Sequence, residues 1–178
     1  MVNVVGSGDI NCELDLDLIL PAIKEETTIS VSRTNQGLKI EFSGRTGTVS
    51  LYRSGKYTIM GSASEEELYR TNDCFLELCI ELGIITDADN TSLHVSNYVY
   101  AVELDENVNL NHLDILLGEE AEYEPEQFSY VVYRPSDIDC TMTISTSGKC
   151  VINTPVGDEE VENAIKTVIS IIDSSPAG

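Results

Sequence analysis

The stretches LYRSGKYTIMG (Leu51–Gly61) and ISTSGKCVINT (Ile144–Thr154) carry the same strand–turn–strand phrase. Their Ser-Gly-Lys turns begin at Ser54 and Ser147, which lie 93 positions apart in a chain of 178 residues. Glycine accepts a positive φ angle, so Ser-Gly between two extended runs predicts a tight hairpin loop. Two such hairpins half a chain apart indicate an internal duplication.

Other segments repeat in the same order around these turns. VNVVGSGD (2–9) corresponds to SNYVYAVEL (96–104), ELDLDLILPAI (13–23) to NVNLNHLDILL (107–117), and SASEEELYRTNDCFLELCIEL (62–82) to VGDEEVENAIKTVISII (156–172). The offset changes by one residue between the first and last of these pairs. The sequence therefore predicts two similar repeats, residues 1–90 and 91–178.

Each repeat is predicted to run strand, short amphipathic helix, several antiparallel strands, helix. Alternating apolar residues in GLKIEF, GTVSLY, KYTIMG, YVVYR, CTMTIS and KCVIN are typical of half-buried strands. The first closing helix begins with a capping box, Ser64 and Glu67. The two closing helices carry apolar stripes at helical spacing, at Leu68, Phe75, Leu78 and Leu82 and at Val161, Ile165, Val168 and Ile172.

These stripes need a sheet face to cover. We therefore expect an α+β fold, in which two repeats form one continuous curved antiparallel sheet with the helices on its convex face. The opposite face is left open, and it is the place to look for function.

The charge of the chain is unusual, because 31 acidic residues against 10 basic ones give a formal net charge of −21. Such acidity opposes nucleic-acid binding in dilute buffer. Molar salt, however, screens charges to within ~3 Å, and a dense acidic shell suits a salt-adapted cytoplasm. The sequence shows neither an apolar run of ~20 residues nor a basic, apolar signal at MVNVVGSGDI, so we expect a cytoplasmic protein without a membrane span.

Catalytic and metal-binding patterns are weak in this sequence. The five cysteines form no Cys-x-x-Cys pair, only two histidines are present, and reduced core thiols are the better interpretation. Neither a Gly-rich phosphate loop nor a nucleophile elbow occurs. We therefore expect no metal, no cofactor and no enzymatic activity.

Taken in order, the phrases VNVV, YRSGKY, GSASEEELYRTNDCFLELCIELGII, EYEPEQF, VVYRP and SGK resemble the TATA-box-binding proteins in their archaeal form. The resemblance covers nearly the whole chain. It implies the family's saddle of ten antiparallel strands with four helices above. The underside of that saddle sits in a widened minor groove and kinks DNA by wedging aromatic rings between base steps.

The resemblance also implies which residues contact DNA. Asn3 and Asn97 match the asparagines that read base edges, and an amide suits A·T pairs because these present only acceptors in the minor groove. Val5 and Val99 match valines that lie against the groove floor. The remaining matched positions are two wedge rings, two further apolar contacts and four cations near phosphate: Tyr52, Phe128, Thr58, Val151, Arg53, Lys56, Lys149 and Arg134.

The sequence also departs from the family pattern. Two of four wedge positions lack a ring, since they are Asn35 and Ser145. The arginine expected in the first repeat is Glu41, a negative charge facing phosphate, and FPG reads FSY at residues 128–130. Met60 and Asn153 replace threonines. Losing two wedges predicts a weakened or redistributed kink.

Two charged stretches each leave two interpretations open. Residues 33–56 hold five basic residues (Arg33, Lys39, Arg45, Arg53, Lys56) against one acid, Glu41, which indicates either ordinary exposed strand charge or a phosphate-facing patch. The acidic stretch GEEAEYEPEQF (118–128) is either a solvated loop or, by the resemblance, a stirrup. In the stirrup interpretation, Glu124 and Glu126 engage basic residues of transcription factor B.

The leading hypothesis is a general transcription initiation factor. It would bind and bend A·T-rich promoter DNA, recruit transcription factor B and, indirectly, RNA polymerase. The alternative is a divergent paralogue with weakened DNA bending that acts mainly as a protein-interaction regulator of transcription factor B. In either case the chain is a candidate homodimer in the absence of DNA.

Overall fold

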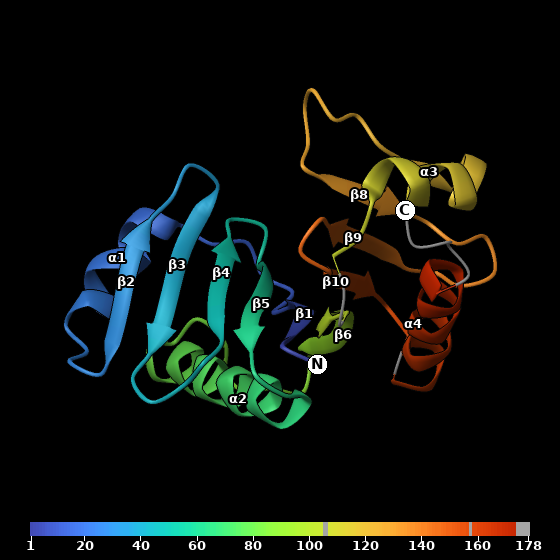
Figure 1. The fold of residues 1–178 in the computed structure, drawn as a ribbon. Coiled ribbons are helices and arrows are strands. Elements are labelled where there is room, and N and C mark those ends of the chain that lie inside the picture. The colour runs from blue at the N-terminus through green and yellow to red at the C-terminus, as the bar shows by residue number, and fades with distance from the viewer. Residues whose placement is uncertain (105–106, 157, 174–178) are drawn as a thin grey trace. The chain divides into compact units, whose positions relative to one another are not determined.

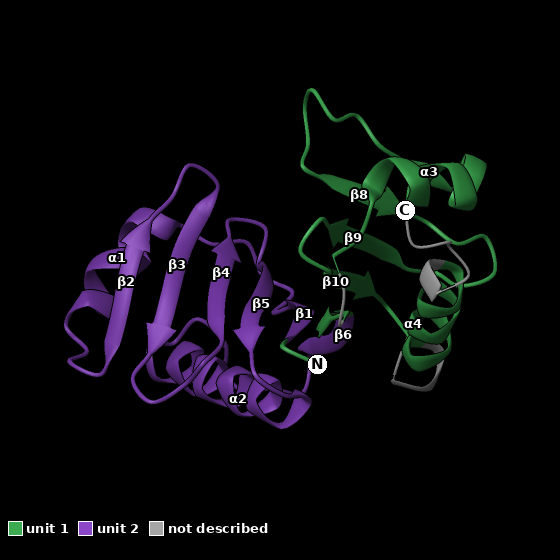
Figure 2. Cartoon of the chain, viewed as in Figure 1, with its two compact units in different colours: residues 1–2, 97–178 green, residues 3–96 purple. Residues whose placement is uncertain are grey.

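The computed structural model describes residues 1–104, 107–156 and 158–173 (Figure 1). The chain forms two compact units, which Figure 2 colours separately: residues 3–96, called unit 2, and residues 1–2 with 97–178, called unit 1. The division falls between Ser96 and Asn97, inside a strand. The repeat boundary after residue 90 stays a prediction, because the units are defined by packing and the repeats by sequence.

Unit 2 holds seven elements and the start of an eighth. They are β1 (Asn3–Asp9), α1 (Leu16–Lys24), β2 (Ile29–Arg33), β3 (Gly37–Phe42), β4 (Thr48–Tyr52), β5 (Lys56–Ser62), α2 (Glu65–Glu81) and the first residues of β6 (Ser92–Glu103). Its strands lie in the order β2-β3-β4-β5-β1, followed by β6, and every resolved pairing is antiparallel. Helix α1 packs on β2 and β3, and α2 packs on β5, β1 and β4.

Unit 1 repeats this plan. After the remainder of β6 come α3 (Leu110–Leu117), a 3-10 turn (Gly118–Glu120), β7 (Ala121–Glu122), β8 (Tyr130–Tyr133), β9 (Thr141–Ser145), β10 (Lys149–Thr154) and α4 (Asp158–Asp173). The strand order is β6-β10-β9-β8-β7. Helix α3 packs on β8 and β7 and contacts α4. Among the described residues, no helix is long and apolar enough to cross a membrane.

The two Ser-Gly turns have the same backbone geometry. Gly55 and Gly148 have φ angles of 84° and 81°, in the left-handed region that glycine tolerates best. The Gly55 N–H donates to Tyr52 O at 3.0 Å, and the Gly148 N–H donates to Ser145 O at 3.0 Å. The hairpins predicted from Ser-Gly are therefore confirmed.

Equivalent backbone bonds tie each turn to the chain that follows the first strand of its unit. Ile10 N donates to Gly55 O at 3.0 Å, and Leu104 N donates to Gly148 O at 2.9 Å. A second equivalent pair joins Leu14 N to Arg53 O at 2.8 Å and Val108 N to Thr146 O at 3.0 Å. The partners differ by 93 or 94 positions, so the sequence repeat is also a repeat of hydrogen bonds.

Helix starts follow their capping residues. Ser64 Oγ accepts from Glu67 N at 3.1 Å and caps α2. Asp15 caps α1, and its equivalent Asn109 caps α3. In a full capping box the Glu67 carboxylate would also accept from Ser64 N. Here Glu67 Oε1 instead pairs with two arginines, Arg45 and Arg70.

The predicted helix stripes are the core-facing residues. Leu68, Phe75 and Leu78 are buried in unit 2, and Leu82 is half-buried. In unit 1, Val161 and Val168 of α4 are buried in the core, and Ile165 of the same helix is partly buried against it. The side chain of Ile172 lies outside the part of the chain that the structure describes.

A buried polar bond holds α2 to the sheet of unit 2. Tyr57 is 1% exposed, its ring centroid lies 4.7 Å from that of Phe75, and its hydroxyl donates to Asn72 Oδ1 at 2.6 Å. Burial raises the pKa of Tyr57, so the hydroxyl stays a donor. Gly8 makes room for this ring, since a Cβ there would lie 2.2 Å from Tyr57 Cζ.

We expect Tyr57→Phe to lower the free energy of unfolding by about 1–3 kcal/mol, because Asn72 Oδ1 loses its donor inside the core. Tyr69, on the exposed side of α2, provides the matched control. Tyr69→Phe should change stability by less than about 0.5 kcal/mol. Urea unfolding in molar KCl measures both, and equal effects would contradict a structural role for the Tyr57 hydroxyl.

Candidate nucleic-acid interface

In each unit, alternate strand residues point away from the helices, and we call this side the open face. In unit 2 the strands bury Val4, Leu38, Ile40, Val49, Leu51, Tyr57 and Ile59 on the helix side. Their alternate neighbours define the open face, which carries Asn3, Val5, Ser7, Asp9, Lys39, Glu41, Thr48, Ser50, Tyr52, Lys56, Thr58 and Met60. In unit 1 the open face carries Asn97, Val99, Ala101, Glu103, Tyr130, Val132, Thr141, Thr143, Ser145, Lys149, Val151 and Asn153.

The strand register brings together several of the residues predicted from the sequence. In unit 2, Thr58 lies opposite Ser7 and Lys56 opposite Asp9. In unit 1, Val151 lies opposite Ala101, and Val99 lies opposite Asn153. Each unit thus holds a strip of small and amide side chains on its two neighbouring strands β1/β5 or β6/β10.

Asn3 is held by a bulge in the β1–β5 pairing. The register shifts between Val4 and Gly6, and Gly61 takes a φ angle of 84°. This frees the Gly61 N–H to donate to Asn3 Oδ1 at 2.8 Å. Because a backbone N–H requires an acceptor, the bond fixes which end of the amide is oxygen. The Nδ2 donors of Asn3 have no partner among the described residues and can donate to a bound molecule.

Asn97 is the equivalent residue of unit 1, and it is half-buried on the open face. The ladder beside it is regular, with Tyr98 opposite Thr154 and no bulge between Lys149 and Thr154. Among the described residues, Asn97 has no side-chain hydrogen bond. The two amides are therefore presented by different means.

Of the four predicted cations, three lie at the Ser-Gly turns beside β5 and β10, and the fourth, Arg134, follows β8. Arg53, Lys56 and Lys149 are exposed at the Ser-Gly turns, and none of them makes an ion pair within the described chain. Arg134 is different, since its Nη1 lies 2.9 Å from Glu122 Oε2. Both partners are more than half exposed, so this pair is weak and exchangeable.

The family model described as "Transcription factor TFIID (or TATA-binding protein, TBP)" matches residues 1–81 and 92–175 of this chain. The chain belongs to the TATA-binding protein family. The TATA-box-binding protein C of Halobacterium salinarum is 38% identical over 165 residues, covering 92% of this chain and 91% of the relative. The TATA-box-binding protein of Archaeoglobus fulgidus is 32% identical over 169 residues, covering 93% and 90%.

Among solved structures, the Methanococcus jannaschii TBP superposes with a TM-score of 0.77 at 29% identity, covering 98% of this chain and 97% of that chain. The α+β fold predicted from the sequence is confirmed by this likeness. Relatives from Halobacterium and Haloferax confirm the predicted archaeal, salt-adapted type. The TATA-binding protein family consists of transcription initiation factors and not of enzymes.

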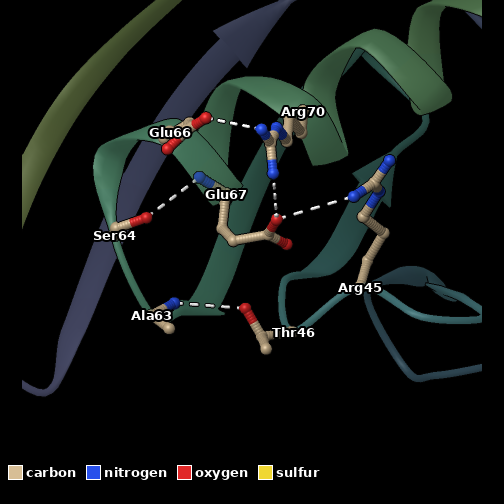
Figure 3. Close-up of polar contacts among 7 residues, drawn as sticks. All are labelled: Arg45, Thr46, Ala63, Ser64, Glu66, Glu67 and Arg70. Carbon is tan, nitrogen blue, oxygen red and sulfur yellow. Dashed lines mark hydrogen bonds and ion pairs between the residues drawn. The ribbon is translucent and has the colours of Figure 1, made fainter.

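The basic excess between residues 33 and 56 is not a single patch. Arg33 pairs with Asp17 of α1 at 3.3 Å, and Arg45 pairs with Glu67 of α2 at 3.5 Å. Figure 3 shows Arg45 and Arg70 converging on Glu67 Oε1, beside the Ser64 cap. Both Arg33 and Arg45 thus serve the helix side, which favours ordinary strand charge over a phosphate-facing patch for these two residues.

Glu41, the acid that replaces an arginine of the TATA-binding protein pattern, is neutralised locally. Lys39 Nζ lies 2.7 Å from Glu41 Oε1 on the open face. The hydrogen bond and charge of Lys39 hold the pKa of the Glu41 carboxyl below its ordinary value, and Thr48 Oγ1 adds a longer bond at 3.5 Å. The negative charge expected to face phosphate is therefore paired, but Lys39 is occupied as well.

Aromatic side chains on the open face include one that the sequence analysis did not select. The rings of Phe128 and Tyr130 lie 5.3 Å apart at 34°. Tyr130 is the Cα partner of Ser145 across β8 and β9. The sequence signal was the replacement of FPG by FSY, which places a second ring two residues after Phe128. Asn35 stands exposed beside the Thr34–Gly37 turn.

The acidic loop between β7 and β8 forms a hydrogen-bonded turn at residues 124–128, just before β8. Gln127 N and Phe128 N donate to Glu124 O at 2.9 and 2.8 Å, and the side chain of Gln127 donates to the Glu124 carboxylate. Glu126 is exposed and makes no hydrogen bond or ion pair within the described chain. The loop therefore holds Phe128 through backbone bonds and presents the Glu126 carboxylate to solvent.

We expect Lys39→Met to raise the pKa of Glu41 toward its ordinary value. A carboxyl with a lowered folded-state pKa stabilises the fold above its unfolded pKa, and this contribution is lost as the pH falls through the folded pKa. Titration of the side-chain carboxyl by NMR measures the shift. Lys24→Met, at the exposed end of α1, is the control and should leave Glu41 unchanged; an unchanged pKa in Lys39→Met would contradict the pairing.

Proposed function

We propose that this chain is a general transcription initiation factor that binds A·T-rich promoter DNA through the minor groove, bends it and recruits transcription factor B. RNA polymerase then follows indirectly, in the cytoplasm. The observation that carries the proposal is the amide of Asn3, whose oxygen is occupied by Gly61 N while its donors stay available. A·T pairs present only acceptors in the minor groove, so fixed amide donors are the complementary group.

The small size of the side chains on the open faces also supports this role. Beside the amides lie Val5 and Thr58 in unit 2 and Val99 and Val151 in unit 1, which are small and half-buried. Small apolar residues permit close approach to the floor of a groove, whereas long charged ones would hold it away. Lys39 on β3 is paired with Glu41, whereas Arg53, Lys56 and Lys149 lie at the turns, where phosphates flank such a groove.

Bending is part of the proposal because each unit carries an aromatic ring outside its strip, on β4 in unit 2 and before β8 in unit 1. Phe128 is 46% exposed, and Tyr52 is half-buried at the end of β4. Rings wedged between base steps unstack them and kink the duplex. Specificity then comes from DNA deformability together with the two asparagines.

A second candidate function is favoured by the Lys39–Glu41 pair and by the exposed Asn35. These features remove one free cation and one wedge from unit 2. In this alternative the chain is a divergent paralogue with weakened bending that acts mainly by binding transcription factor B. The two functions differ in which activity dominates, the binding and bending of promoter DNA or the binding of transcription factor B.

We expect the affinity for an A·T-rich duplex to rise between about 0.2 M and about 2 M KCl, the reverse of the usual trend. The net charge of −21 repels phosphate until salt screens it, and few unpaired cations are present to lose by screening. Fluorescence anisotropy with a labelled duplex, with and without transcription factor B, measures this. If no complex forms at any salt with transcription factor B present, the initiation function is wrong and the paralogue function stands.

We expect Asn3→Asp to weaken duplex binding about tenfold or more, because the carboxylate still accepts from Gly61 N but cannot donate to base acceptors. Its thermal stability should be nearly unchanged. Asn163→Asp, which adds the same charge on exposed α4, is the control and should bind as wild type. Asn97→Asp should repeat the loss. Unaltered binding by Asn3→Asp would exclude Asn3 from base contact.

We expect the double substitution Glu124→Gln and Glu126→Gln to weaken recruitment of transcription factor B to the chain–DNA complex, with duplex binding alone unchanged or improved. The physical reason is the loss of two exposed carboxylates that pair with basic residues. Glu25→Gln with Glu26→Gln, at the exposed end of α1, is the charge-matched control. Equal effects of the two double variants would remove the loop from the binding site.

A further inference from the structure

One cross-strand pair on the open face contains an aromatic ring in both units, but the ring lies on a different strand of the pair in each unit. In unit 2, Tyr52 of β4 lies opposite Gly37 of β3. In unit 1, the equivalent pair is Ser145 of β9 opposite Tyr130 of β8. Each pair therefore combines one ring with one small residue. The ring that unit 1 lacks at residue 145 is present at residue 130.

The small partner is required in unit 2. A Cβ at Gly37 would lie 2.0 Å from the backbone oxygen of Leu51, so that strand position accepts glycine alone. The ring of this pair must come from β4. No such restriction acts on β8, where Tyr130 occupies the corresponding position.

The hydroxyl of Ser145 makes its hydrogen bonds within the Ser-Gly turn that follows β9. Its Oγ lies 2.9 Å from Ser147 Oγ and donates to Lys149 O at 3.2 Å. The side chain is thus satisfied locally. The aromatic ring of this cross-strand pair is therefore that of Tyr130.

Tyr130 is directed to the open face by the alternation of β8. Val131 and Tyr133 are buried on the helix side, whereas Tyr130 and Val132, which alternate with them, are half-buried on the other side. The ring centroid of Tyr130 lies 5.3 Å from that of Phe128, which is itself 46% exposed. Two adjacent rings therefore stand at the end of unit 1.

We propose that Tyr130 takes over the DNA wedge that Ser145 lacks, and that it contacts the same base step as Phe128. This inference rests on the proposed function. Its ligand is an unstacked A·T-rich base step in the minor groove, which a flat apolar ring contacts over a large area. Unit 1 then presents two rings at its kink and unit 2 presents one, Tyr52, so the two kinks differ.

The test uses the full chain in molar KCl with an A·T-rich duplex that carries 2-aminopurine at successive positions, whose fluorescence rises when a step unstacks. Tyr130→Ala should weaken binding about tenfold and remove the rise at one step. Tyr52→Ala should remove it at a different step. Tyr130→Phe, which keeps the ring, should behave as wild type, as should Tyr69→Ala on the exposed side of α2.

A ring transplant separates the ring from other effects of the substitution. The double variant Tyr130→Gly with Ser145→Tyr copies the arrangement of unit 2 and should restore binding and unstacking lost in Tyr130→Ala. The proposal is overturned if Tyr130→Ala binds and unstacks as wild type, if Tyr130→Phe fails as Tyr130→Ala does, or if the folded transplant restores nothing. Wild type that binds no duplex at all would instead overturn the proposed function, and this inference with it.

Discussion

The strands of each unit bury alternate side chains beneath two helices, and every other feature of the protein depends on this burial. In unit 1 the core joins Val131, Met142, Ile144 and Ile152 of the sheet to Leu113 and Val168 of the helices. Because side chains alternate along a strand, packing one face against helices determines which residues stand on the other. A shift of one residue in register would bury the asparagines and expose the core. The open face is therefore specified by the core.

Some basic residues of this acidic chain are paired with a neighbouring carboxylate, and others are not. Arg33, Arg45 and Lys39 each lie within 3.5 Å of a carboxylate, whereas Arg53, Lys56 and Lys149 at the turns have no such partner among the described residues. Exposed pairs of this kind contribute little stability, particularly in salt. Their effect is on the distribution of charge. Within the described chain, the cations left without an ion pair are Lys24 at the end of α1 and Arg53, Lys56 and Lys149 at the two turns.

The two units share hydrogen bonds but differ in side chains. The two Ser-Gly turns make equivalent backbone hydrogen bonds. The asparagines differ, because Asn3 of unit 2 is bound at a bulge by Gly61, which has a positive φ angle, whereas the strand pairing beside Asn97 of unit 1 is regular. The rings differ as well, because Tyr52 and Tyr130 lie on opposite members of equivalent strand pairs. A duplicated backbone thus carries two unlike surfaces, which fits a ligand whose two ends are not identical.

The repeat, the helices, the hairpins and the α+β class could all be predicted from the sequence, since they follow from periodicity, capping residues and glycine, which act over a few residues. It also indicated the family and its matched positions, including Asn3, Asn97, Tyr52 and Phe128. Four contacts could be found only in the folded chain: Gly61 N with Asn3 Oδ1, Lys39 with Glu41, Arg45 with Glu67, and the cross-strand pair Tyr130 and Ser145. Each of these joins residues on different strands or in a loop and a helix, or depends on which face of a strand a side chain occupies. Register and bulges set those relations, and short-range patterns do not encode them.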